Sequence, residues 1–322
     1  MDSFDPALIS VVMPCHNAAV FVGEALASAL GQSYPHIEVI VVDDGSTDDT
    51  SRIVAEVAAR HPARVRLVYQ PNAGPYAARN RGLALAHGNF IAFLDAPDAW
   101  HPEALERLHA AMMDTLADVA YCGWQDFGEA ATDTQPTIPP DYAEADASRL
   151  FLQACPWPIN SVLLRRQLVD ALHGFSERRP TAMDQDFWLR LLPTRPSVTR
   201  VPEALALRRR YHRGDPRIPR WQQLFDAVAV REDFVRRHPA QVAHLDPVER
   251  ADTLYGQLLP EAYRCHWRRD LASSRRLFRR AARKTRWRAR DAKYILASFL
   301  PASVFDGLIH FVDKRRNARP IS

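Results

Sequence analysis

The sequence predicts an α/β fold with a doubly wound, mixed but mainly parallel sheet, followed by a helical C-terminal region. Between residues 8 and 192, short apolar runs rich in β-branched residues alternate with stretches of helical periodicity. This alternation is typical of strands that are buried on both faces of a sheet and joined by crossover helices. Beyond about residue 218 only the helical period remains. We therefore expect two domains, residues 1–215 and residues 216–322.

The predicted elements follow one another in a regular order. Residues 8–13 and 37–42 form the first two strands, and apolar positions between residues 20 and 30 recur with the period of a helix. A second helix begins after residues 46–49, because their hydroxyl and carboxylate groups can cap free N–H groups. The remaining elements are strands at residues 65–69, 90–94, 119–122 and 161–164, and helices at residues 76–86, 102–114 and 183–192.

One stretch interrupts this order. Residues 128–146 are acidic, hold three prolines and show no clear period, so we expect an irregular excursion there. Such a segment could border the binding site of an acceptor.

Composition narrows the class of protein. With 322 residues, 47% of them hydrophobic and 25% charged, the chain has the make-up of a globular protein with a full core. Its four cysteines are far apart and form no C-x-x-C pair, which favours a reducing compartment over a zinc ribbon or a disulfide framework. The N-terminus is acidic and shows no secretory signal. We expect a cytoplasmic protein.

The charge is distributed unevenly. The net charge is only +4, but residues 261–322 hold 17 Lys and Arg against 5 Asp and Glu, whereas residues 1–260 hold 25 against 33. A basic end on an acidic body can meet nucleic acid, anionic lipid or only solvent. No recognised nucleic-acid-binding module accompanies the basic residues, so we expect no nucleic-acid partner.

The C-terminal region also contains an apolar stretch. Residues 294–312 have the length of a membrane span, but Pro301, Asp306 and His310 are costly at the centre of a bilayer. The arginine-rich flanks favour amphipathic helices that lie on an anionic membrane, which would place the protein peripherally at the inner face. A helical domain that packs on the preceding body is an equally good interpretation.

Acidic residues follow several of the predicted strands. Residues 14–17, 43–46 and 95–98 each come after a strand, and ligands of open parallel sheets bind at the carboxyl ends of strands. No G-x-G-x-x-G follows the first strand and no P-loop is present, so a nucleotide would have to be bound by another kind of motif. Carboxylates can hold a divalent cation that bridges to a diphosphate. Asp95 and Asp98 suit that function.

Two longer segments resemble a known family. They read ISVVMPCHNAAVFVGEALASALGQSYPHIEVIVVDDGSTDDT and NAGPYAARNRGLALAHGNFIAFLDAPDAWHP, and the likeness resumes in NSVLLRRQLVDALHGF and MDQDFWLRLL. They are similar to family 2 glycosyltransferases, which have the GT-A fold. The resemblance implies inverting transfer of a sugar from a nucleotide diphosphate donor to an acceptor hydroxyl, with Mg²⁺ or Mn²⁺ as cofactor.

The resemblance also implies residues that contact the donor nucleoside. Pro14, His16 and Asn17 stand where the family's first nucleotide-contacting loop lies. Asp44 resembles the acid that accepts a hydrogen bond from the uracil N–H, so a UDP-sugar is the first choice of donor. The alternative for Asp44 is a helix cap near Ser46.

Residues around the phosphates are implied in the same way. Arg79 matches a basic residue near the nucleotide and its phosphates. Asp95 and Asp98 match acids of the metal-binding motif, with Asp95 also on the nucleotide side, but Pro97 replaces a third acid that the family usually carries. The alternative is an Asp-Pro turn that leads into a helix.

A separate segment carries the implied catalytic base. Asp184 aligns with the family's base, which takes the proton of the acceptor, and Met183 replaces the acid that usually precedes it. Asp186 points elsewhere on the helix and is a structural residue in our interpretation. His212 stands where some relatives place a phosphate or metal contact.

Other classes of protein remain open. Pro97 and Met183 also fit a nucleotide-sugar binding or scaffold protein that has lost catalysis. A nucleotidyltransferase on a related fold lacks its usual glycine-rich basic first loop here. For an active enzyme we expect a glycan or lipid-linked acceptor, such as a precursor of a cell-surface polysaccharide or a glycolipid.

Overall fold

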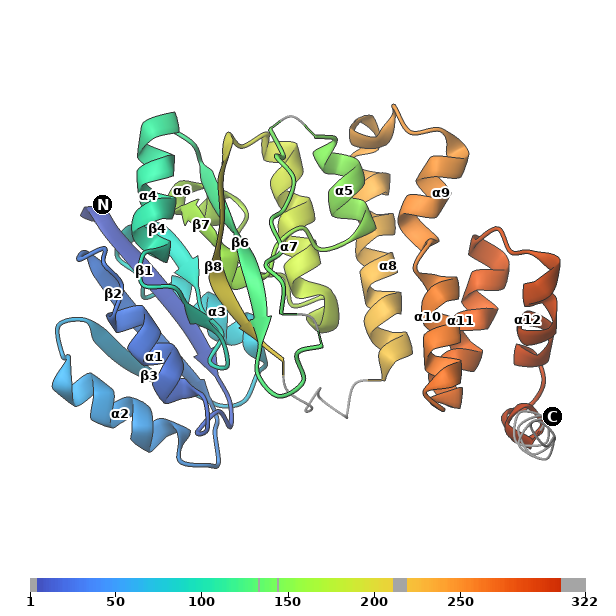
Figure 1. The fold of residues 1–322 in the computed structure, drawn as a ribbon, viewed down its shortest axis with the longest axis horizontal. Helices are drawn as coiled ribbons and strands as arrows, with labels where there is room; N and C mark the ends of the chain where they lie inside the picture. Colours follow the sequence, from blue (N-terminus) through green and yellow to red (C-terminus); the bar gives the residue numbers. More distant parts are fainter. Residues whose placement is uncertain (1–4, 133, 144, 211–218, 308–322) are drawn as a thin grey trace. The chain divides into compact units, whose positions relative to one another are not determined.

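The chain divides into two compact units, Met1–Gly214 and Asp215–Ser322. The structure is a computed structural model that describes residues 5–132, 134–143, 145–210 and 219–307. Figure 1 shows strands and helices in the first unit and helices in the second. Each unit is described by itself below.

The first unit is built on one mixed sheet. Among the described residues it has eight strands in the order β3-β2-β1-β4-β7-β6-β8-β5. The strands β1 to β4 pair in parallel, β7 is antiparallel to both of its neighbours, and β8 is parallel to β6. The bounds are β1 Asp5–Cys15, β2 Ile37–Asp44, β3 Val65–Gln70, β4 Gly88–Phe93, β5 Ala99–Trp100, β6 Val119–Phe127, β7 Val162–Arg165 and β8 Val198–Arg209. The predicted α/β fold class is confirmed.

Helices connect these strands. They are α1 Val22–Leu30, α2 Thr50–Arg60, α3 Pro75–Leu83, α4 Ala104–Thr115, α5 Ala147–Gln153, α6 Arg166–Ala171 and α7 Met183–Leu191. Short 3₁₀ segments lie at Ile159–Ser161, Pro180–Ala182 and Leu192–Thr194. Helix α3 approaches β1 closely at Gly82, where an added Cβ atom would stand 2.4 Å from the side chain of Val12. Glycine therefore lets this helix pack directly on the central strand.

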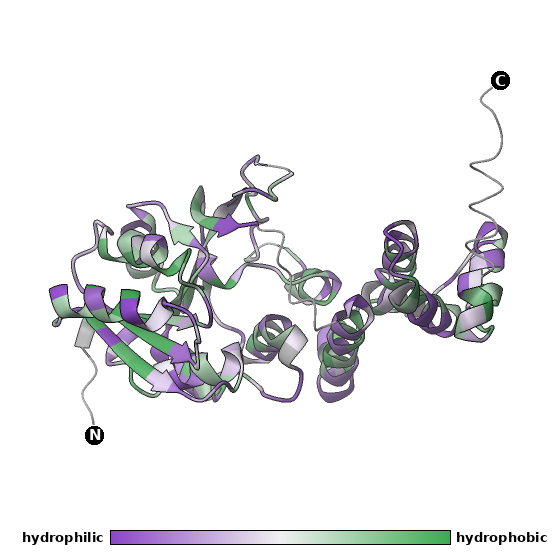
Figure 2. Cartoon of the chain, turned by 90° about the horizontal axis from the view of Figure 1, so that it is seen from below, coloured by the Kyte–Doolittle hydropathy of each residue, from purple (hydrophilic) through white to green (hydrophobic). Residues whose placement is uncertain are grey.

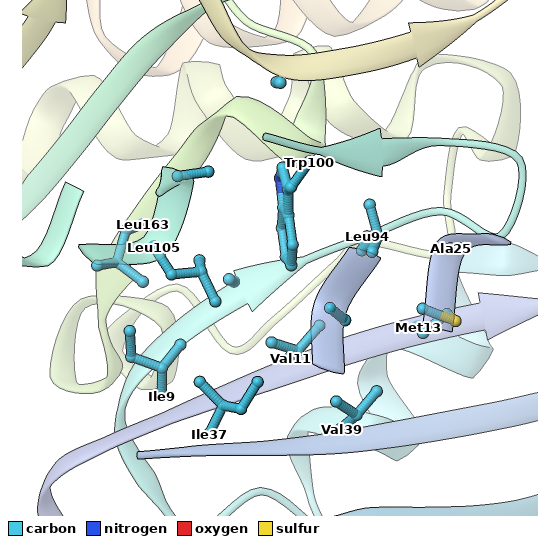
Figure 3. Packing of buried hydrophobic residues seen from close by; sticks show 14 of the residues in the cluster. Ile9, Val11, Met13, Ala25, Ile37, Val39, Leu94, Trp100, Leu105 and Leu163 are labelled. Carbon is cyan, nitrogen blue, oxygen red and sulfur yellow. The ribbon is translucent and has the colours of Figure 1, made fainter. Parts of the chain in front are cut away.

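The core explains why the first strands were recognisable in the sequence. Every residue from Ile9 to Met13 is buried, because β1 lies in the middle of the sheet with β2 on one side and β4 on the other. Figure 3 shows part of this core, with these residues labelled: Ile9, Val11, Met13, Ala25, Ile37, Val39, Leu94, Trp100, Leu105 and Leu163.

Two strands were not predicted from the sequence. The short strand β5 has only two residues, and β8 contains Pro202, which argues against a strand in sequence reasoning. The structure accommodates this proline by an irregularity in the pairing. Cys122 of β6 pairs with Val201, but the next residue, Gly123, pairs with Ala204. Pro202 therefore falls in a bulge, where no ladder hydrogen bond is required of it.

The excursion at residues 128–146 is irregular, as predicted. Its described part contains no helix, and Thr137 forms an isolated bridge with Trp124. The segment is nevertheless anchored, because Tyr142 is buried and its backbone N–H donates to the hydroxyl of Tyr121 at 2.9 Å. The ring of Tyr142 also packs against that of Trp157, with centroids 5.1 Å apart.

The second unit is helical in its described part. Its helices are α8 Arg220–Arg237, α9 Pro247–Tyr255, α10 Leu258–Trp267, α11 Leu271–Lys284 and α12 Ala292–Ser298, with 3₁₀ segments at Pro239–Val242 and Ala289–Asp291. Figure 2 shows both hydrophilic and hydrophobic residues on these helices. One cluster of buried side chains consists of Leu224, Val228, Leu258, Ala262, Cys265, Leu277, Phe278, Ala281 and Ile295. Within residues 5–307, the gaps aside, no helix combines the length and the apolar character that crossing a membrane requires.

Candidate active site

Asp44 organises the loop that precedes α3. It is the last residue of β2 and is buried. Its Oδ1 atom accepts hydrogen bonds from Gln70 Nε2 at 2.7 Å and from the Ala73 N–H at 2.8 Å, and its Oδ2 atom accepts one from the Gly74 N–H at 2.8 Å. Sequence reasoning missed Gln70, although it is the last residue of β3 and the rule of strand ends points to it.

The structure excludes the helix-cap interpretation of Asp44. The acid that bonds the turn at Ser46 is Asp43, whose Oδ1 atom accepts from the Ser46 N–H at 2.9 Å. Asp43 also accepts from the hydroxyl of Ser51 in the first turn of α2. Asp44 is therefore not the cap near Ser46, and its carboxylate is directed to the loop before α3.

The loop after β1 is joined to the end of β2. The Nδ1 atom of His16 lies 2.9 Å from the backbone oxygen of Asp44. The Asn17 N–H donates to the hydroxyl of Ser46 at 2.9 Å, and Asn17 has a φ of 49°, in the left-handed region that asparagine tolerates better than most residues. Pro14 corrects the prediction: it is a buried residue inside β1, because this strand extends to Cys15, so the loop begins only at His16.

Arg79 lies at the centre of a group of three charged residues. Its guanidinium Nη2 donates to both carboxylate oxygens of Asp95, at 2.7 and 3.0 Å, and Nη1 donates to Asp184 Oδ1 at 2.9 Å. Nη1 also lies 3.4 Å from the sulfur of Met183. The side chain of Arg79 is 2% exposed, whereas those of Asp95 and Asp184 are each 34% exposed. One arginine on α3 thus joins a residue that follows β4 to the first turn of α7.

The protonation states follow from this pairing. Burial disfavours the cation, yet Asp95 and Asp184 raise the pKa of Arg79 above its ordinary value, so the guanidinium stays charged. Burial raises the pKa of Asp184, Arg79 opposes this increase, and the charge of Asp95 adds to it. A carboxylate whose pKa is raised is a better proton acceptor than an ordinary one.

Asp98 has a different environment. It is buried, and its Oδ1 atom accepts a hydrogen bond from the backbone N–H of Arg209 at 2.9 Å. Burial raises the pKa of Asp98 to about 7, and repulsion by Asp95 contributes. Arg209 also donates from Nε to the carbonyl of Pro97 at 2.8 Å, and its guanidinium lies over the ring of Phe127. Sequence reasoning missed Arg209, because the strand that positions it was not predicted.

The acidic residues allow a limited test of metal binding. The described residues contain no group of three or more His, Cys, Asp or Glu side chains arranged to hold an ion. Asp95 and Asp98 are nevertheless close enough for one charge to disfavour the other, and a cation between them would relieve that repulsion. Mg²⁺-like ions are often bound by one or two carboxylates together with phosphate oxygens of a ligand. The two acids fit such an ion when a diphosphate completes the ligand set.

The remaining site predictions have different outcomes. Asp186 pairs with Arg190 on the same helix at 2.7 Å, in agreement with a structural role. Trp188, on the same helix, is fully buried. His212 lies outside the described residues.

The environment of Asp98 predicts how stability depends on pH. Because its pKa is about 7 in the folded protein and about 4 in an unfolded chain, the folded state retains a proton that the unfolded state releases between these values. The free energy of unfolding should therefore fall as the pH rises through this window. The Asp98→Asn variant, which cannot ionise, should show a smaller decrease in urea midpoint, measured with a chelator present. Asp114→Asn, at an exposed position of α4, should leave the pH dependence of the parent unchanged.

The fold and the site define a class of protein. A mixed sheet whose strand ends carry Asp44 and Asp95, with Arg79 on α3 and a further carboxylate on α7, is the architecture of GT-A glycosyltransferases. The chain belongs to a specific family of this class, because the model described as "Glycosyl transferase family 2" matches residues 10–176. The predicted family is thereby confirmed.

Individual relatives agree with this assignment. An uncharacterised glycosyltransferase of Haemophilus influenzae is 33% identical over 56% of this chain and 69% of its own length. The putative teichuronic acid biosynthesis glycosyltransferase TuaG of Bacillus subtilis is 31% identical over 58% of this chain and 72% of its own length. The uncharacterised glycosyltransferase alr2836 of Nostoc sp. is 30% identical over 50% of this chain, and the match spans 52% of that relative.

Solved structures share the fold. The TarS 1–349 fragment of S. aureus in complex with UDP has a TM-score of 0.62 and 17% identity, with 98% of this chain and 93% of that chain covered. The mannosyltransferase PcManGT of Pyrobaculum calidifontis, in complex with GDP-Man and Mn²⁺, has a TM-score of 0.56 and 20% identity over 96% of this chain and 87% of that chain. At these identities the likeness shows the fold alone.

Proposed function

We propose that this chain transfers a sugar from a nucleotide diphosphate donor, with a UDP-sugar as first choice, to the hydroxyl of an acceptor with inversion at the anomeric carbon. The observation that carries the proposal is the double ion pair of Arg79 with Asp95 and Asp184. It holds Asp95, a carboxylate that could bind a cation on the donor diphosphate, beside Asp184, a carboxylate that could accept a proton from the acceptor. Solved structures of the same fold contain UDP, and in one case GDP-Man with Mn²⁺.

The donor nucleoside is proposed to meet Asp44. Each carboxylate oxygen can accept about two hydrogen bonds. Oδ1 of Asp44 accepts two within the protein, whereas Oδ2 accepts one and retains capacity for a ligand N–H. Uracil presents an N–H at its Watson–Crick edge, and cytosine presents an acceptor nitrogen there. Asp44 would therefore favour uracil over cytosine.

The phosphates and the acceptor are proposed to meet the residues around Arg79. The buried guanidinium of Arg79 positions the carboxylates of Asp95 and Asp184. A divalent cation held through Asp95 and Asp98 would neutralise the charge of the departing diphosphate. Asp184 accepts the proton of the acceptor hydroxyl as its oxygen attacks the anomeric carbon from the face opposite the diphosphate. Arg79 holds Asp184 in place by the bond of 2.9 Å.

For the acceptor we propose a glycan or lipid-linked precursor of a cell-surface polysaccharide. Support comes from the name of TuaG, a relative assigned to teichuronic acid biosynthesis. The irregular segment at residues 128–146 is the proposed border of the acceptor site. A binding protein without catalysis remains the alternative that Pro97 and Met183 favour, and it predicts no turnover of any donor.

A nucleotide panel tests the donor assignment. In the presence of Mn²⁺, UDP should raise the melting temperature of the parent protein more than CDP, GDP or ADP do, because a ligand that binds only the native state stabilises it. Asp44→Asn should reduce the preference for UDP over CDP by roughly tenfold or more, since a mispaired buried polar group costs about 1–3 kcal/mol.

A matched control separates recognition from general damage. Asp49→Asn, at an exposed position before α2, should leave the nucleotide preference unchanged. The melting temperature of Asp44→Asn without ligand reports how far the loop before α3 is disturbed. If Asp44→Asn retained the full preference for UDP, Asp44 would not read the base.

A further inference from the structure

Large apolar side chains are exposed along the last described part of the second unit. Leu296 is 66% exposed, Phe299 46% and Val304 49%, and Leu300 between them is also exposed. Leu296 and Phe299 are separated by three residues, and Leu300 and Val304 by four. Exposed apolar side chains are common singly, but a contiguous group of them marks an interaction surface.

An arginine stripe adjoins these apolar side chains. Arg275, Arg279 and Arg283 follow one another at intervals of four residues on α11, so they lie along one side of that helix. Arg275 Nε donates to the carbonyl of Leu300 at 3.0 Å, and Arg279 Nε donates to the carbonyl of Ser298 at 2.5 Å. The guanidinium of Arg279 also lies over the ring of Phe299. The stripe therefore adjoins the exposed apolar side chains at Phe299 and Leu300.

The charges of this stripe are not neutralised within the described part of the chain. None of the three arginines has an ion pair with a described carboxylate. Other basic residues of α11 do have such partners, because Arg280 and Lys284 both form ion pairs with Glu232 of α8. Like charges at intervals of four residues repel one another in an isolated helix, so the stripe gains stability from an anionic partner.

We infer that Arg275, Arg279 and Arg283, together with Leu296, Phe299 and Val304, form a docking surface for an anionic lipid bilayer. Apolar side chains enter the boundary of the acyl region while arginines contact lipid phosphates, which is how amphipathic helices bind at such an interface. A soluble polyanion could pair with the arginines, but it would leave Leu296, Phe299 and Val304 exposed to water. A dimer formed through this surface would place the arginines of one copy against those of the other, and these like charges would repel. The inference does not depend on the proposed sugar transfer.

Vesicle sedimentation tests the docking surface. The full chain is mixed with vesicles of phosphatidylcholine alone or with a large fraction of phosphatidylglycerol, and bound protein is measured in the pellet. We expect binding to the anionic vesicles only, and weaker binding at high salt. The variant Arg275→Gln/Arg279→Gln/Arg283→Gln should bind about 100-fold more weakly, from roughly fivefold for each arginine near the surface.

Two further variants distinguish lost charge from lost structure. Arg275→Lys/Arg279→Lys/Arg283→Lys keeps the charge but not the fork geometry, and should retain most of the binding. Leu296→Ser/Phe299→Ser should weaken binding while the salt dependence persists. Thermal unfolding of each variant shows whether the second unit remains folded.

A control triple variant tests whether the site is specific. Arg236→Gln/Arg237→Gln/Arg250→Gln removes the same charge from α8 and α9 of the same unit and should bind the vesicles like the parent. Equal losses in both triple variants would overturn the proposal in favour of a net-charge effect. Equal binding to both kinds of vesicle would also overturn it. So would binding to heparin that requires the three arginines, if Leu296→Ser/Phe299→Ser left vesicle binding intact.

Discussion

Replacing Asp184 with asparagine is expected to lower the rate of sugar transfer by about 10²–10⁴-fold, which is the usual contribution of a general base. Asparagine keeps the shape of the side chain, and its amide oxygen can still accept the hydrogen bond from Arg79. The fold should therefore persist while proton acceptance is lost. The measurement is the initial rate of transfer to an acceptor, or of donor hydrolysis, with Mn²⁺ present.

The adjacent acid provides the control for this experiment. Asp186 lies on the same helix but pairs with Arg190, whose guanidinium also bonds the carbonyls of Leu172 and Gly174. Asp186→Asn should reduce stability modestly and leave the rate per folded molecule near that of the parent. If the two variants lost the same activity, or if Asp184→Asn lost none, Asp184 would not be the base.

Replacing Arg79 with methionine is expected to cost about 3 kcal/mol of the free energy of unfolding. Removing one partner of a buried charge network leaves the others uncompensated, and such losses lie near 3–5 kcal/mol. The lower end applies here because the carboxylates of Asp95 and Asp184 are each one-third exposed, so water stabilises them in part. Urea unfolding at neutral pH measures the difference.

Further variants identify the origin of this loss. Arg79→Lys retains a positive charge but has no planar fork, so it should not bond Asp95 and Asp184 together and should recover only part of the stability. Adding Asp95→Asn and Asp184→Asn to Arg79→Met removes the unpaired charges and should restore much of it. An unchanged urea midpoint for Arg79→Met would show that the network contributes nothing to folding.

Local sequence patterns were sufficient for most of the first unit. The strand at residues 8–13 was predictable because all its residues except Ser10 are apolar, as its interior place in the sheet requires. The strand β8 was not, because Pro202 lies in it and only the pairing with β6 shows that a bulge accommodates the proline. Whether a proline can stand in this strand is therefore determined by the neighbouring strand and not by local propensity.

The site shows the same limit. The acids at the strand ends were predictable, because the topology of a parallel sheet brings those ends together. The pairing of Arg79 was not, since Asp95 lies 16 residues away in the chain and Asp184 lies 105. Asp98 likewise accepts its hydrogen bond from the backbone of Arg209, which is 111 residues away. Such contacts are fixed by the packing of the whole unit.

The position of α3 links recognition to chemistry. The backbone of Gly74, at the start of this helix, bonds Asp44, and Arg79 follows five residues later on the same rigid element. A substitution that removes the hydrogen bond between Asp44 and the Gly74 N–H would tilt α3 and displace the guanidinium of Arg79. Adaptation to a donor with another nucleobase would thus have to preserve a carboxylate at Asp44, or evolve a new anchor for α3 at the same time.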